Sequence, residues 1–152
     1  MEPLHASRFA PVEAPLAERW AKFPKGWDRP YFPTLVGLVL EEVRTDYARM
    51  RLPFRPELEQ PAGAVHGGAI ATLIDTVVVP AVGQAYAPDW AYFTIAMNIR
   101  YIGVVAQQDA VAEGWIEQRG RTLVFCRAEV RTDDGKLAAD GTLTYTVRPP
   151  RA

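Results

Sequence analysis

The sequence predicts an α+β fold in which a curved, mostly antiparallel sheet of about six strands wraps around one long central helix. One segment, about residues 67–86, carries apolar side chains around nearly its whole circumference, and a helix that is apolar all round must be buried all round. Other segments alternate apolar and polar residues with the period of two that is typical of strands. The apolar faces of such strands and of such a helix bury each other if the sheet curls around the helix. At 152 residues, the chain has the length of one domain with its own core.

The expected strands span residues 35–40, 47–54, 93–101, 109–119, 122–132 and 137–147. The first is a continuous apolar run broken only by Gly37, which is typical of a strand covered on both faces. The last alternates cleanly, and Asp140 is among the side chains expected to face out. Asp134-Gly135 is a strong hairpin signal before it. Pro80 should either kink the long helix or end it early, and the pattern leaves both open.

The chain divides into an N-terminal arm at 1–33, a main domain at 34–148 and a short tail at 149–152. The arm is rich in proline, with Pro3, Pro11, Pro15, Pro24, Pro30 and Pro33. Pro15 could open a short helix, because proline fits the first helical position. That helix would pack the arm onto the domain through one apolar face, made of Leu16, Trp20 and Phe23.

Composition excludes several classes of protein. The formal net charge is −1, so nothing suggests electrostatic binding to nucleic acid. A single cysteine, Cys126, cannot form an internal disulfide, which fits a reducing compartment. The N-terminus does not have the pattern of a secretory signal, and no apolar run has the length of a membrane span. We therefore expect a cytoplasmic protein without membrane association.

Asp75 stands in the middle of the apolar helix. Its helical neighbours at three and four positions carry no positive charge, since they are Ala71, Thr72, Val78 and Val79. An ionised carboxylate without partners in an apolar interior is very costly. Either an arginine from a strand or backbone groups satisfy it, or the helix passes a cleft in which Asp75 acts as base or nucleophile. The position alone leaves both interpretations open.

The motif His66-Gly67-Gly68 begins the same helix. Two glycines there cost stability and suggest a backbone that something must approach closely, although paired glycines also occur in merely flexible loops. The first amides of a helix lack internal partners and lie at the positive end of its dipole, so they can hold a carbonyl oxygen as it gains negative charge. His66 is either structural or catalytic. The only other histidine is His5, which argues against a histidine-based metal site.

The stretch from Gly63 to Asp75, with the sequence GAVHGGAIATLID, resembles the signature of the phenylacetate-pathway (PaaI-type) hotdog thioesterases. The resemblance continues through 97–101 and the Gly120-Arg121 turn, and covers roughly residues 34–148. It implies that the Gly67 amide polarises a thioester carbonyl and that Asp75 attacks it or activates water. It also implies that Thr94 helps to place this water, and that no cofactor or metal is required.

The chain departs from that family pattern at two places. Gln60 stands where asparagine is usual, six residues before the histidine, and this feature is more similar to a branch of the 4-hydroxybenzoyl-CoA thioesterases. That branch carries glutamate where this chain has Asp75. Gln60 can still donate a hydrogen bond near the thioester. Gly103-Val104 replaces a usual proline after the strand at 93–101.

Helix geometry separates the two central groups. Gly67 and Asp75 are eight residues apart, about 12 Å along a helix axis and roughly 80° around it. An oxyanion donor and an attacking group must each lie about 3 Å from the same reacting atom. One helix cannot achieve this, but a second copy of the chain can supply its Asp75 to this Gly67. We therefore expect an obligate homodimer. A dimer of dimers is expected as the larger assembly, but the sequence leaves the choice between dimer and tetramer open.

The activity expected from these features is hydrolysis of an acyl-CoA thioester. Gly68 should contact the substrate, and Arg100 and Arg121 are candidates for the phosphates of CoA, unless they are ordinary solvated arginines. The acyl group cannot be read from the sequence. One alternative is a hotdog dehydratase or hydratase, but such enzymes typically have a bulky residue and proline in place of Gly67-Gly68. Another is a non-catalytic acyl-CoA-binding module, against which the lone buried acid argues.

Overall fold

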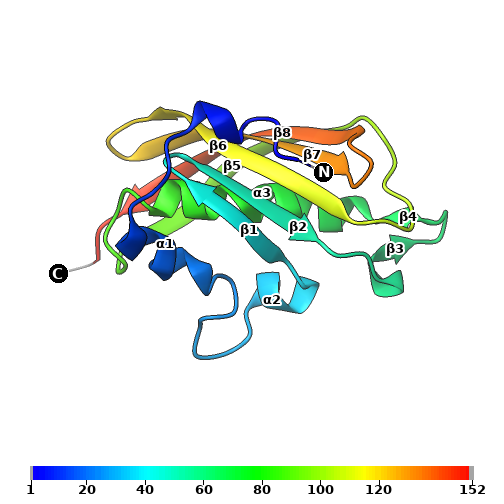
Figure 1. Cartoon of the computed structure of the whole chain (residues 1–152), viewed down its shortest axis with the longest axis horizontal. Helices are drawn as coiled ribbons and strands as arrows, with labels where there is room; N and C mark the ends of the chain where they lie inside the picture. The colour runs from blue at the N-terminus through cyan, green and yellow to red at the C-terminus, as the bar shows by residue number, and fades with distance from the viewer. Residues whose placement is uncertain (1, 151–152) are drawn as a thin grey trace.

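The computed structural model describes residues 2–150 and confirms the predicted architecture, a curved antiparallel sheet wrapped around one long helix (Figure 1). The central helix is α3 (Gly67–Gly83). The sheet has six strands in the order β1-β2-β6-β7-β8-β5. Their bounds are β1 (Val39–Arg44), β2 (Tyr47–Leu52), β5 (Ala91–Tyr101), β6 (Ala110–Arg119), β7 (Leu123–Thr132) and β8 (Leu137–Arg148). A separate two-stranded hairpin, β3 (Glu59–Gln60) with β4 (Ala64–Val65), leads into α3.

The core lies between α3 and the concave face of the sheet. Helix side chains that are fully buried there include Leu73, Ile74, Val77, Val78 and Val82. The backbones approach closely at Gly114 on β6, where an added Cβ would lie 2.8 Å from methyl groups of Val77 and Val78. Pro80 lies inside α3, which ends three residues later at Gly83 instead of reaching residue 86. The helix thus ends soon after Pro80, and this early end was one of the two expectations.

The expected strand at 35–40 is wrong in its first half. Residues Phe32–Val36 form a short helix, α2, which spans the expected boundary between arm and domain. Pro33 lies in its first turn, and Gly37 ends it in the left-handed region with φ of 87°. These two capping residues outweigh the apolar run, because proline favours a helix start and glycine a helix end. The strand begins only at Val39.

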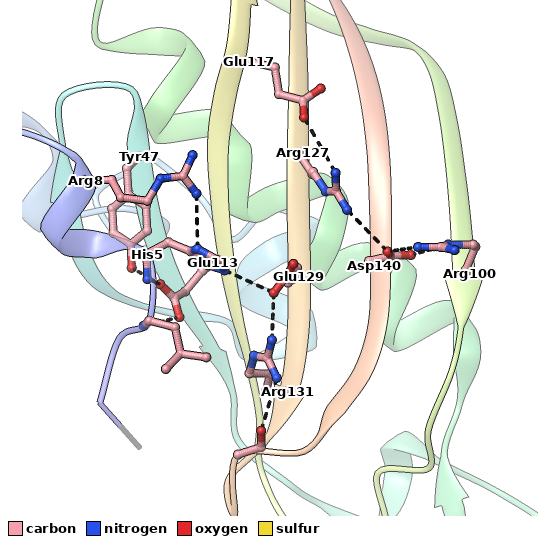
Figure 2. Close-up of polar contacts among 12 residues, drawn as sticks. His5, Arg8, Tyr47, Arg100, Glu113, Glu117, Arg127, Glu129, Arg131 and Asp140 are labelled. Carbon is pink, nitrogen blue, oxygen red and sulfur yellow. Dashed lines mark hydrogen bonds and ion pairs between the residues drawn. The ribbon is translucent and has the colours of Figure 1, made fainter.

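The arm holds two further short helices, η1 (Ala6–Arg8) and α1 (Ala14–Ala21). As expected, Pro15 lies in the first turn of α1, which begins at Ala14. The helix packs through Trp20, which is buried against the C-terminal end of α3. η1 lies on the outer face of the sheet (Figure 1). There the amides of Leu4 and His5 donate to the carboxylate of Glu113 at 2.9 and 2.8 Å (Figure 2). The arm therefore contacts both faces of the domain.

The edge strand β5 has an unusual surface. It pairs with β8 on one side, and within residues 2–150 no strand pairs with its other side. Four large side chains on it are more than 40% exposed, namely Phe93, Ile95, Met97 and Tyr101. A long apolar edge strand of this kind readily pairs with another chain. Among the described helices, none is both long and apolar enough to cross a membrane.

Candidate active site

Asp75 lies on the half-buried side of α3, where β5 and β8 pass the helix. Its carboxylate oxygen Oδ1 accepts a hydrogen bond from the Thr94 hydroxyl at 2.7 Å and lies 2.9 Å from the Tyr145 hydroxyl. Thr94 on β5 and Tyr145 on β8 are direct cross-strand partners, so the sheet register places both hydroxyls at one carboxylate. No arginine, lysine or histidine among residues 2–150 forms an ion pair with Asp75. The arginine pairing considered from the sequence is therefore wrong.

The two oxygens of this carboxylate have different surroundings. Oδ1 is held by the hydroxyls, whereas Oδ2 has no hydrogen-bond partner within the described part of the chain. Tyr145 can also donate to the backbone carbonyl of Asp75, at 2.7 Å. Burial and the neighbouring Asp75 carboxylate raise the pKa of the Tyr145 hydroxyl well above its usual range. The phenol therefore stays a donor, and Oδ2 is the oxygen without a hydrogen-bond partner among the described residues.

Sequence reasoning identified Asp75 and Thr94 but missed Tyr145. The signal was present, because Tyr145 occupies an inward-facing position of an alternating strand. A buried tyrosine hydroxyl needs a partner, and so does a carboxylate on a buried helix. Seventy residues separate the two in the sequence, so nothing local joins them.

The start of α3 is capped by His66, whose Nδ1 accepts a hydrogen bond from the Gly68 amide at 2.9 Å. The His66 amide donates to the Leu58 carbonyl, and the Ala69 amide donates to the His66 carbonyl. Within residues 2–150, Gly67 is thus the residue of this first turn whose N–H has no partner. The expected oxyanion donor is the amide that remains free, whereas the Gly68 amide is already used.

Tyr101 closes one side of the helix start. Its hydroxyl donates to the Gly67 carbonyl at 2.9 Å, and an added Cβ on Gly67 would lie 3.4 Å from its ring. A cavity of about 160 Å³ adjoins Gly67, Ile70, Tyr101 and Val104. Any side chain at position 67 would therefore crowd both the ring and the free amide.

Gln60, at the end of β3, supports the loop before the helix. Its side-chain oxygen accepts a hydrogen bond from the Ala62 amide at 3.1 Å, and its backbone carbonyl accepts one from Gly63 at 2.9 Å. Its side-chain NH₂ group has no partner within the described residues. Gln60 thus braces the turn and keeps a free donor.

Within one protomer, the helix start and the carboxylate are far apart. Gly67 contacts Tyr101 and Asp75 contacts Thr94, both on β5. These contacts are seven residues apart on the strand, or roughly 23 Å, while the helix rises about 12 Å between its two residues. The structure does not bring Gly67 and Asp75 of one chain to a common point.

The two candidate arginines also lie apart. Arg100 pairs with the buried Asp140, with Nε 2.8 Å from Oδ1 and a second contact from its Nη2 (Figure 2). Asp140 was expected to face out, but Arg100 and Arg127 from the neighbouring strands cover it. Hydrogen bonding to Arg100 lowers the pKa of the Asp140 carboxyl. Arg121 is exposed in the turn between β6 and β7 and has no ion-pair partner within residues 2–150.

Sheet register gives the separation of these arginines. Arg100 lies opposite Asp140 on β8, whereas Leu123, two residues after Arg121, lies opposite Thr146. Asp140 and Thr146 are roughly 20 Å apart along the strand. Arg100 is therefore at the Tyr101 end of β5 and Arg121 at the Thr94 end. No group of three or more histidine, cysteine or acidic side chains within residues 2–150 is arranged to hold a metal.

Comparison with known proteins agrees with this architecture. A Halobacterium salinarum protein whose name places it provisionally among the esterases is 30% identical over 114 residues, which cover 72% of this chain and 75% of that protein. The solved structure of conserved protein PA5202 from Pseudomonas aeruginosa is 30% identical, with a TM-score of 0.74, and covers 79% of this chain and 95% of its own.

The structure of Escherichia coli PaaI, from the phenylacetic acid degradation operon, shares the fold at 15% identity and a TM-score of 0.71. It covers 78% of this chain and 84% of its own. Residues 62–139, which include Asp75, Thr94 and the start of α3, match the thioesterase superfamily. The resemblance found in the sequence is thereby confirmed, and the chain belongs to the thioesterase superfamily, with the hotdog fold.

Proposed function

We propose that this protein hydrolyses acyl-CoA thioesters to a free acid and CoA, with Asp75 as the general base or nucleophile. The observation that carries this proposal is the state of the Asp75 carboxylate. It is half-buried, it has no cationic partner among residues 2–150, and two hydroxyls hold its Oδ1 while Oδ2 stays free. A carboxylate with only a structural role would be expected to use both oxygens.

In the general-base form of the reaction, Oδ2 takes a proton from water as the water oxygen attacks the thioester carbonyl. The carbonyl oxygen gains negative charge and accepts a hydrogen bond from the free Gly67 amide. When the intermediate collapses, the carbon–sulfur bond breaks, and the proton passes from Asp75 to the thiolate of CoA. In the nucleophilic form, Oδ2 itself attacks the carbonyl carbon, the carbon–sulfur bond breaks, and CoA leaves as the thiolate. Water then hydrolyses the resulting anhydride to the free acid and the Asp75 carboxylate, and the proton released from the water goes to the thiolate.

Either form requires Gly67 and Asp75 at one carbonyl, so the site is shared between two protomers. The unpaired, apolar edge of β5 supports pairing with a second copy of the same strand. Placing Gly67 of one protomer beside the partner's Asp75 would also bring Arg100 and the partner's Arg121 to the same site, since each lies at the corresponding end of β5. Arg121 is the stronger candidate for a CoA phosphate, because Arg100 is already paired with Asp140.

The test is Asp75→Asn, measured by thiol release from a panel of acyl-CoA substrates. Asparagine keeps the shape and can accept from the two hydroxyls, but it removes the base or nucleophile, so turnover should fall by at least about a hundredfold. Asp89→Asn is the matched control, because Asp89 is exposed beyond the end of α3. If Asp75→Asn and Asp89→Asn turn over at the same rate, Asp75 has a structural role and the proposal is wrong.

A further inference from the structure

A cavity of about 390 Å³ lies between the arm and the domain, at the side of α3 that the sheet does not cover. Three aromatic side chains of the arm line it, namely Trp20, Phe23 and Trp27. From the domain, Val79 and Tyr92 complete the wall. The cavity thus exists only because the arm packs there, and the arm lies outside the segment that matches the superfamily.

Two lining residues, Val79 and Tyr92, relate the cavity to Asp75, which does not itself line it. Val79 is four residues after Asp75 on α3, so it lies on the same face, about one turn or 6 Å further along. Tyr92 is two residues before Thr94 on β5, so the two side chains share a face of the strand. The helix and the strand that hold the carboxylate therefore both continue directly into the cavity wall.

The aromatic wall is held in place by a series of edge-to-face contacts. Ring centroids are 5.5 Å apart for Trp20 and Phe23, 5.2 Å for Phe23 and Trp27, and 5.1 Å for Trp27 and Tyr31. Arg19 fixes the helix of the arm, because its guanidinium donates to the Tyr86 carbonyl at 2.9 Å and lies 3.2 Å from the Tyr92 hydroxyl. Trp27 nevertheless stays 42% exposed at the cavity. Preformed, largely apolar cavities of this size, about 300–1,000 Å³, are typical of small-molecule sites.

We propose that this arm cavity binds the acyl group of the thioester, and that the arm thereby selects large apolar acyl groups over short ones. The proposal rests on the hydrolysis proposed above. An acetyl group would leave the cavity empty, whereas each methylene buried in it should raise kcat/KM by about fourfold, until the cavity is filled. The occupant is the acyl group of a substrate held at Asp75, because Val79 and Tyr92 of the cavity wall lie on the same helix face as Asp75 and the same strand face as Thr94.

Trp27→Ala is the first test, with acetyl-, octanoyl- and phenylacetyl-CoA as substrates. Phe32→Ala is the matched control, since Phe32 is a 60% exposed aromatic of the same arm that does not line the cavity. Trp27→Ala should lower kcat/KM for the two large substrates by about tenfold, chiefly through KM, and leave acetyl-CoA nearly unchanged. Phe32→Ala should change none of the three. Equal losses on all three substrates, or no loss, would overturn the proposal.

Phe23→Ala gives a second test with a different expected result. Phe23 also lines a neighbouring cavity of about 320 Å³, so removing its ring should join the two spaces. The preferred acyl chain should then become longer, which a merely destabilised arm would not produce. If Phe23→Ala or Trp27→Ala instead weakens the dimer in size-exclusion chromatography without altering acyl preference, a second copy of the chain fills the cavity and the proposal is wrong.

Binding without turnover separates this proposal from the proposed hydrolysis. Octanoyl-CoA is titrated against Asp75→Asn, and the tryptophan fluorescence is followed, since Trp20 and Trp27 line the cavity. Binding to Asp75→Asn should quench the tryptophan fluorescence. In the double variant Asp75→Asn/Trp27→Ala the quenching should be lost or altered, and the Kd for octanoyl-CoA should be about tenfold higher than in Asp75→Asn. An unchanged Kd would refute the acyl site, whatever the hydrolysis assay gives. Absence of hydrolysis in the wild-type protein, with this binding intact, would refute only the hydrolysis.

Discussion

Two variants that are each inactive should regain activity when their subunits exchange, if the site is shared between protomers. One variant is Asp75→Asn, which removes the base or nucleophile. The other is Gly67→Val, whose added Cβ would lie 3.4 Å from the Tyr101 ring and whose methyl groups would crowd the free amide. Each site needs one intact Gly67 and one intact Asp75. Both chains of a homodimer carry the same substitution, so each homodimer has two dead sites. Gly67 and Asp75 of one chain are about 12 Å apart along α3, so a working site needs them from opposite chains.

Mixing gives a defined recovery. In a heterodimer, one site combines an intact Gly67 with an intact Asp75 from opposite chains, and the other site carries both defects. Random exchange makes about half of the dimers mixed, so about a quarter of all sites should work. Thiol release from an acyl-CoA measures this recovery, and fluorescence energy transfer between labelled subunits measures the exchange.

The double variant Gly67→Val/Asp75→Asn, mixed with wild-type chains, is the matched control. If the site is shared, every mixed dimer is dead and activity falls to about a quarter of the wild-type value per total chain. If each site lies within one chain, activity falls only to about a half. The shared site would be refuted if the two single variants exchange subunits without regaining activity and if the second mixture keeps about half of the wild-type activity. This holds provided that both single variants show wild-type circular dichroism.

Three further predictions concern single residues. Tyr145→Phe removes one of the two hydroxyls that contact the Asp75 carboxylate. A hydrogen bond to a charged group is worth about 1.5–3 kcal/mol, so kcat should fall roughly ten- to hundredfold while KM changes little. A lowered melting temperature with normal kcat would contradict this prediction. Gln60→Ala should lower turnover by a smaller factor than Asp75→Asn and leave thermal stability nearly unchanged; loss of folding without a specific catalytic defect would show that Gln60 only braces its loop. Because Arg100 lowers the pKa of Asp140, this pair stabilises the fold above the usual carboxyl pKa, near 4, and the effect is lost as pH falls through the lowered value. The melting temperature of Asp140→Asn should therefore be below that of the wild type at neutral pH, and the two should converge as the pH falls through the lowered pKa of Asp140. A difference that persists in strong acid would exclude this origin.

Local patterns in the sequence were sufficient for the main elements of the fold. The all-round apolar segment after residue 66 could only be a buried helix, and the alternating segments gave five strands with bounds close to those observed. The positions of Gly67 and Asp75 on one helix also fixed their separation, because helical rise and rotation per residue are constant. At residues 33–37 two local signals compete, because the apolar run favours a strand whereas Pro33 and Gly37 favour the start and the end of a helix. The helix forms, so the two capping residues outweigh the apolar run.

The tertiary structure decided which distant groups meet. Tyr145 reaches Asp75 because β8 pairs with β5 in a register that places it opposite Thr94, and register depends on the whole sheet rather than on any one strand. Asp140 is buried for the same reason, since Arg100 and Arg127 lie on the two strands beside it. The cavity between the arm and α3 depends on the arm folding back over the helix. The sequence by itself thus determined the elements and the spacing within each one, whereas contacts between elements follow from packing, which acts between residues far apart in the chain.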